Sequence, residues 1–201
     1  MKNLAMVFFV FLMIGIIAVA AETDEVNELI TEAQNAYAEQ NYREAAVQLN
    51  RALAKVNDLL VTDLKSFLPE PFGGWDADPA EGGASGLELL SKLSVKRRYF
   101  KRGTGRSIEF EIISNSPQIP SLRQWLSNPQ LLNSKENIQL DEINDKRCIS
   151  RFESNDRFAE VNMIVGSSML VRIRGFEAKN LDEVKDFAKK IDIEKMEKKF
   201  P

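Results

Sequence analysis

The sequence of 201 residues contains no histidine and a single cysteine. Without histidine there can be no Ser-His-Asp triad, no Cys-His pair and no metal site with imidazole ligands. One cysteine excludes an internal disulfide and a zinc–thiolate cluster, and we expect Cys148 to be buried in a strand, the alternative being an intermolecular disulfide. A Gly-rich phosphate loop and a nucleophile elbow are also absent. We therefore predict no catalytic residue, no metal ligand and no cofactor.

Residues 1–20 have the features of a secretory signal peptide. Lys2 precedes an almost wholly apolar run over residues 4–19, and small residues close that run. This order of charge, apolar run and small residues predicts cleavage after Ala20 or Ala21, and hence a periplasmic or secreted mature chain. An uncleaved anchor is the alternative, because the run approaches the ~20 residues that span a bilayer.

The spacing of apolar residues over 21–67 predicts a helical hairpin. Apolar or small residues recur at steps of three and four over residues 24–40 and again from residue 42 to about residue 67. The dipeptide Gln40-Asn41 between them predicts a tight turn. Two amphipathic helices joined by a short turn form an antiparallel pair.

The second of these helices resembles a tetratricopeptide repeat. The residues that carry this resemblance are Tyr42, Ala45, Leu49, Ala52 and Leu53, with Ala33 and Ala36 on the preceding helix. Only about one repeat is covered, whereas a stable array needs about three. We therefore expect no peptide-binding solenoid within one chain. The hairpin is expected to pack on the rest of the protein, on a second copy or on a protein partner, through Tyr42, Leu49 and Leu53.

Residues 68–90 are rich in glycine and proline, which predicts a linker. A large aromatic side chain rarely lies free in a loop, so Trp75 is expected to anchor this segment on the core. The string Pro-x-Pro-x-Gly-Gly-Trp over residues 69–75, followed by strands and a C-terminal helix, resembles a group of secreted bacterial proteins of unknown function. That resemblance implies a fold and a compartment rather than an activity.

The pattern of apolar residues and turns over residues 91–201 predicts an α+β domain. In this domain, helices pack on a mainly antiparallel sheet of about six strands. The expected strands cover residues 93–102, 107–114, 137–143, 147–153, 158–165 and 168–174, joined by short turns. A short helix carries Trp125, the second candidate anchor. A last helix is expected to begin at Asn180, with Glu183 completing a capping box.

The two halves of the expected mature chain differ in charge. Residues 21–90 contain 14 acidic and 4 basic residues, whereas residues 91–201 contain 16 acidic and 22 basic residues. The candidate residues of a basic surface are Lys96, Arg97, Arg98, Lys101 and Arg102. An acidic protein or an anionic membrane surface would suit such a stretch, whereas the leader argues against nucleic acid. Local pairing with Glu109 and Glu111 is the alternative.

These observations predict a non-catalytic extracytoplasmic protein that acts as an interaction or adaptor module. One alternative is a carrier or sensor of a small apolar, amphiphilic or anionic ligand, which would require a concave pocket near Trp75 or Trp125. The other alternative is a hydrolase that uses two carboxylates, which would require a cleft where two acidic side chains converge.

Overall fold

The computed structural model describes residues 24–85, 92–133 and 135–201. Its contacts divide the chain into two units, Met1–Leu59 and Leu60–Pro201. The expected signal peptide lies outside the described residues, as does the end of the expected linker. Each unit is described below by itself.

The first unit is a pair of helices. Residues 24–38 form one helix, and helix α2 (Tyr42–Lys65) follows after a turn and continues into the second unit. Gln40 takes the left-handed conformation (φ 62°), and the Asn41 side chain accepts a hydrogen bond from the Glu44 N–H at 3.3 Å. The expected turn at residues 40–41 is therefore confirmed. The side chains buried in the pair are Leu29, Ala33, Ala36, Ala45, Gln48 and Ala52.

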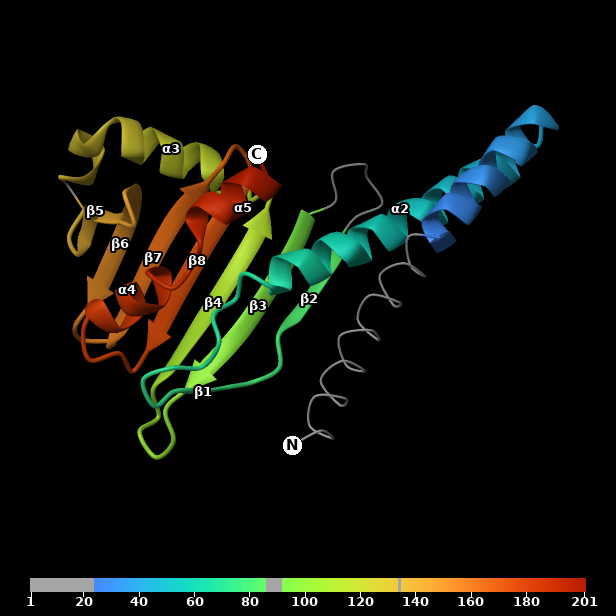
Figure 1. The fold of residues 1–201 in the computed structure, drawn as a ribbon. Coiled ribbons are helices and arrows are strands. Elements are labelled where there is room, and N and C mark those ends of the chain that lie inside the picture. Colours follow the sequence, from blue (N-terminus) through green and yellow to red (C-terminus); the bar gives the residue numbers. More distant parts are fainter. Residues whose placement is uncertain (1–23, 86–91, 134) are drawn as a thin grey trace, which may run out of the picture. The chain divides into compact units, whose positions relative to one another are not determined.

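The second unit is built on one antiparallel sheet of eight strands, in the order β1-β3-β4-β8-β7-β6-β5, with β2 also paired to β3 (Figure 1). The strands are β1 (Asp76–Ala77), β2 (Glu81–Ser85), β3 (Lys92–Phe100), β4 (Ser107–Ser114), β5 (Ile138–Ile143), β6 (Lys146–Glu153), β7 (Phe158–Val165) and β8 (Met169–Phe176). The α+β class and the antiparallel sheet are confirmed. The sheet has two strands more than the six or so expected.

The two additional strands lie in the Gly/Pro-rich segment for which a linker was expected. β1 and β2 both pair with β3, so this segment extends the sheet along its edge. Gly82 lies opposite Val95, and a Cβ atom at Gly82 would come within 2.7 Å of the Val95 Cγ1 atom. Glycine therefore permits the close approach of β2 and β3 here. Because glycine has a low strand propensity, the sequence of β2 does not indicate a strand.

Helices cover both faces of the sheet. The larger core lies between one face and the last turns of α2 together with α4 (Asp182–Ala188) and α5 (Ile193–Lys199). The smaller core lies on the other face beneath α3 (Ile119–Ser127) and the 3-10 helix η1 (Pro129–Leu132). Strand alternation assigns the side chains to these faces: Ile108, Phe110 and Ile112 are fully buried in the larger core, whereas Glu109 and Glu111 point to the other face.

The C-terminal segment forms two helices where one was expected. The predicted capping box forms only in part: the Asn180 side chain accepts a hydrogen bond from the Glu183 N–H at 3.3 Å, but the Glu183 carboxylate accepts from the Lys179 N–H at 3.0 Å, and the helix begins at Asp182 after Leu181. The helix ends at Ala188, and Asp192 caps α5 by accepting a bond from the Lys195 N–H at 3.0 Å. The charged run at residues 194–199 belongs to α5, whose Met196 is fully buried.

Candidate functional site

The hairpin carries a large apolar surface outside its own core. Of the eight exposed large apolar side chains in the described residues, six lie on these two helices: Ile30, Tyr37, Tyr42, Val47, Leu49 and Val56. Leu49 is 55% exposed and Leu53 is half-buried. The buried side chains between the two helices are Leu29, Gln48 and alanines, and Leu49 is not among them. Because Leu53 is only half-buried, Leu53→Ala should cost less stability than the loss of a fully buried leucine.

All of these exposed residues except Val47 form one face. On α2, apolar residues alternate in steps of four and three along a single stripe: Tyr42, Ala46, Leu49, Leu53, Val56 and Leu60. On the preceding helix Val26, Ile30 and Tyr37 share one side. The rings of Tyr37 and Tyr42 are in edge contact, with centroids 5.6 Å apart, so the two stripes adjoin at the turn.

Charged residues lie away from this apolar face. Helical geometry places Glu28 and Glu32 on the opposite side of the first helix, and Arg51 on the opposite side of α2. An ion pair between Lys55 and Glu25, 2.9 Å long, joins the two helices on that charged side. The apolar face is bordered mainly by uncharged polar residues such as asparagine and glutamine.

The basic stretch on β3 does not form one cationic patch. Alternation along the strand directs Lys96 and Arg98 to one face of the sheet and Arg97 to the other. Acidic side chains of the preceding segment neutralise most of these cations. The ion pairs are Lys96–Glu81 at 3.2 Å, Arg97–Glu70 at 3.3 Å, Arg98–Asp78 at 3.8 Å and Arg102–Asp76 at 2.8 Å. The hydrogen bond from Lys96 to Glu81 raises the pKa of the Lys96 ammonium.

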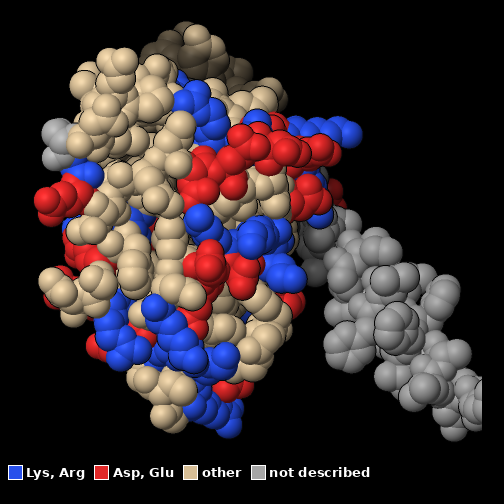
Figure 2. All heavy atoms as spheres, turned by 90° about the vertical axis from the view of Figure 1, so that its left-hand side faces the viewer, with Lys and Arg blue, Asp and Glu red and all other residues tan. Residues whose placement is uncertain are grey.

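The glutamates expected as partners of these cations bind arginines of β8 instead. Arg172 donates two hydrogen bonds to Glu111, at 2.6 and 3.2 Å, and Arg174 is paired with Glu109. Arg174 also lies 3.8 Å from Glu111. Figure 2 shows acidic and basic side chains next to one another over much of the face that it presents.

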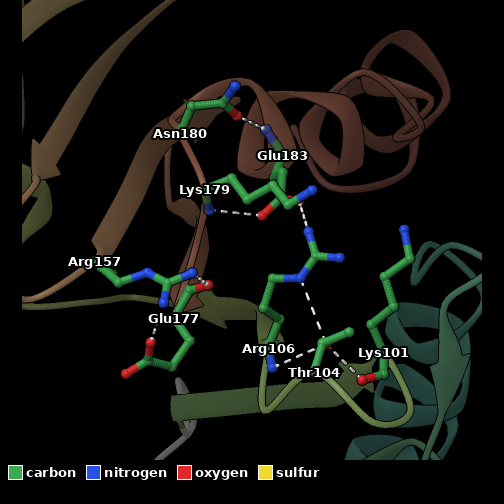
Figure 3. A network of polar contacts seen from close by, with 8 residues as sticks. All are labelled: Lys101, Thr104, Arg106, Arg157, Glu177, Lys179, Asn180 and Glu183. Carbon is green, nitrogen blue, oxygen red and sulfur yellow. Dashed lines mark hydrogen bonds and ion pairs between the residues drawn. The ribbon is translucent and has the colours of Figure 1, made fainter.

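Trp75 and Arg106 hold the β3–β4 turn against α4. Trp75 packs on Phe187 with ring centroids 5.5 Å apart, and Lys101 and Arg106 lie over its ring at 5.5 and 5.9 Å. The largely buried Arg106 is paired with Glu183, the residue of the α4 cap, as Figure 3 shows. This network is a structural clamp, because each of its charged groups has a partner within the fold.

Trp125 lies at the edge of a cavity of about 310 Å³ between α3 and the strands β5, β6 and β7. Its apolar wall is formed by Leu122, Trp125, Ile138 and Ile149, and its polar side by Gln118, Ser121, Arg151, Glu160 and Asn162. This volume is at the lower end of the ~300–1,000 Å³ typical of small-molecule sites. The cavity therefore has the concave form and the place near a tryptophan that a ligand pocket would require, but its lining is only partly apolar.

Two buried ionisable groups, Cys148 and Tyr99, lie in the larger core. Burial raises the pKa of the Cys148 thiol to about 12, and burial also raises the pKa of Tyr99, whose hydroxyl donates to the Pro69 carbonyl at 2.6 Å. The expected burial of Cys148 is confirmed. A thiol with so high a pKa is a poor nucleophile at neutral pH. Cys148 is therefore a packing residue.

Asp141 on β5 is the clearest paired carboxylate near these groups. Burial acts to raise its pKa, but hydrogen bonds from Lys185, the Glu142 N–H and Ser150 outweigh burial and lower it. A lowered pKa keeps Asp141 ionised and bound to Lys185 down to acidic pH. Asp141 therefore joins β5 to α4 as a structural contact.

The described residues hold no group of three or more Asp, Glu or Cys side chains placed to bind a metal ion. Across the same part of the chain, no helix combines the length and the apolar character needed to cross a membrane. No family model, curated protein or solved structure matches this chain, so both resemblances noted in the sequence stay predictions.

The polar side of the cavity was missed by the sequence analysis. Alternation along β7 could have assigned Glu160 and Asn162 to one face, because the apolar residues Ala159, Val161 and Met163 alternate with them. Nothing in the sequence indicates that α3 and its Trp125 cover that face. The cavity depends on a contact between segments about 40 residues apart, which local patterns do not reveal.

Proposed function

We propose that this chain is a non-catalytic extracytoplasmic protein that associates through the apolar face of its helical hairpin, and that the occupant of this face is a second copy. The observation that carries the proposal is the continuous exposed stripe of Tyr42, Leu49 and Val56, with Ile30 and Tyr37 beside it. Apolar patches of this kind on a protein surface are typical of contact sites.

The spacing of the stripe favours helical partners. Steps of four and three residues give the 3.5-residue repeat with which helices pack side by side, the side chains of one fitting between those of the other. Two hairpins joined at this face would form a four-helix bundle. The absence of acidic residues from the face of each copy removes the repulsion that two identical surfaces would otherwise suffer.

We expect the double substitution Leu49→Asp and Val56→Asp to weaken self-association by at least about a hundredfold, because four carboxylates would be placed in an apolar interface. The measurement is sedimentation equilibrium of the chain that starts at Ala21, over a range of protein concentrations. Circular dichroism of the same samples reports whether the helices persist.

The matched control is Val47→Asp, which makes the same chemical change on the same helix. Val47 is 45% exposed but lies outside the stripe, so this variant should associate like the unsubstituted chain. A chain that is monomeric at all concentrations would overturn the proposal. So would equal association of the double variant and the control.

The extracytoplasmic location has its own test. We expect the exported protein to begin at Ala21 or Glu22, because the order of charge, apolar run and small residues fits a cleaved leader. Intact-mass spectrometry of a periplasmic or secreted fraction measures this directly. A species that keeps Met1 and sediments with membranes would contradict cleavage and support an anchor.

A further inference from the structure

The cavity beside Trp125 holds hydrogen-bond acceptors that the protein does not use. The Oδ1 atom of Asn162 is buried and, within the described residues, accepts no hydrogen bond. The carboxylate of Glu160 also lines the cavity, and no ion pair or hydrogen bond joins it to any described residue. Buried acceptors in folded proteins are nearly always paired. The buried Oδ1 atom of Asn162 and the partly exposed carboxylate of Glu160 lie on one side of one cavity and therefore favour a bound donor there.

The terminal nitrogens of the two arginines next to these acceptors are paired with other carboxylates, whereas the buried Nε atom of Arg174 has no partner among the described residues. Arg151 and Arg174 lie opposite Glu160 on the two neighbouring strands. Arg151 is paired with Glu153 and lies over the Phe158 ring at 5.7 Å, while Arg174 is paired with Glu109. The negative charge of Glu160 is therefore not cancelled by a direct contact, and it favours a cationic donor in the cavity.

The opposite wall suits an apolar body. Leu122, Ile138 and Ile149 supply aliphatic surface, and the Trp125 ring lies beside them. Lys135 already places its ammonium 5.3 Å from the centre of the Trp125 ring, so this ring attracts a cation in the fold itself. The apolar wall and the acceptors together fit a ligand that has an apolar group and a protonated amine.

We propose that this cavity binds a small amphiphile that carries a protonated amine. The ammonium donates hydrogen bonds to Asn162 Oδ1 and to the Glu160 carboxylate, and the apolar group lies against Trp125 and the aliphatic wall. The site belongs wholly to the sheet unit and does not depend on association through the hairpin.

The test compares three probes that each carry a polar group on a phenylethyl group: 2-phenylethylamine, 2-phenylethanol and the slightly larger 3-phenylpropionate. The chain contains two tryptophans, so its ¹H–¹⁵N spectrum shows two indole N–H signals, assigned with Trp75→Phe and Trp125→Phe. Titration with the amine should shift the Trp125 signal and leave the Trp75 signal in place. The amine should bind at least about tenfold more tightly than the alcohol, and the carboxylate most weakly.

Two variants separate recognition from folding. Glu160→Gln keeps the shape of the side chain but removes its charge, so the preference for amine over alcohol should fall about tenfold. Asn162→Leu removes the unpaired acceptor, so amine binding should weaken while the urea midpoint of unfolding stays equal or rises. Glu142→Gln makes the same change at an exposed residue of β5 that lies outside the cavity, and it should leave amine binding unaltered.

Three results would overturn the proposal. One is the absence of any shift of the Trp125 signal with the amine. Another is equal or tighter binding of 3-phenylpropionate, which would make Arg151 the recognising group. The last is an unchanged amine preference in Glu160→Gln, because the charge would then have no part in recognition.

Discussion

Replacing Phe187 with alanine is expected to lower the free energy of unfolding of the sheet unit by about 3–5 kcal/mol. Phe187 is fully buried, and its ring contacts those of Phe72, Trp75 and Tyr99 at centroid distances of 4.6, 5.5 and 4.7 Å. The substitution leaves a cavity where four aromatic rings meet. Urea unfolding followed by tryptophan fluorescence measures the change.

The control for Phe187 is Phe176→Ala. Phe176 is 42% exposed and has one ring contact, to Phe158 at 5.8 Å. Folding removes much less of its area from water than of the area of Phe187, and Phe176→Ala leaves no enclosed cavity, so the loss should be less than about 1 kcal/mol. Equal losses for the two phenylalanines would show that the aromatic cluster is not the centre of the core.

Replacing Glu111 with alanine is expected to cost about 2–4 kcal/mol, a large effect for a charged side chain. Glu111 binds Arg172 through two hydrogen bonds and lies near Arg174, and the three side chains are only 15, 18 and 31% exposed. Removing the carboxylate leaves two arginines without that partner on a largely covered face. Chemical denaturation by urea, which leaves ionic strength unchanged, measures the loss.

The exposed pair Arg157–Glu177 supplies the comparison. Both side chains are about half exposed, and the two charges lie 3.0 Å apart. Water and salt screen such a pair, so Glu177→Ala should cost no more than about 1 kcal/mol. The double variant Glu111→Ala, Arg172→Leu should recover part of the loss, because it no longer leaves Arg172 unpaired. A double variant worse than the sum of its parts would contradict this account.

The elements with strong local patterns could be predicted from the sequence. The steps of three and four in the hairpin, and the alternation of Ile108, Phe110 and Ile112 with glutamates in β4, each identify an element and its buried side. The strands from β5 to β8 were also predicted as antiparallel strands joined by short turns, and each of them does pair with the next along the chain. Periodicity suffices where one face of an element is buried and the other is not.

Elements formed by long-range contact could not be predicted. β1 has two residues, and β2 contains two glycines, so neither shows alternation; both exist because β3 offers an unpaired edge. The pairing of the basic residues also depends on this edge, since it places Asp76, Asp78 and Glu81 beside β3. The candidate cavity likewise arises only when α3 closes over β5–β7.

The pairing of β4 with β8 has a consequence for how the protein acquires its fold. Arg172 and Glu111, neighbours on these strands, are 61 positions apart in the chain. A chain emerging from its N-terminus can form the hairpin and the β3–β4 pair early, because both are local. β4 then keeps one edge unpaired and one apolar face uncovered until β8 has been synthesised and pairs with it. Such high contact order slows folding, and β4 is the strand that a chaperone would need to shield until β8 pairs with it.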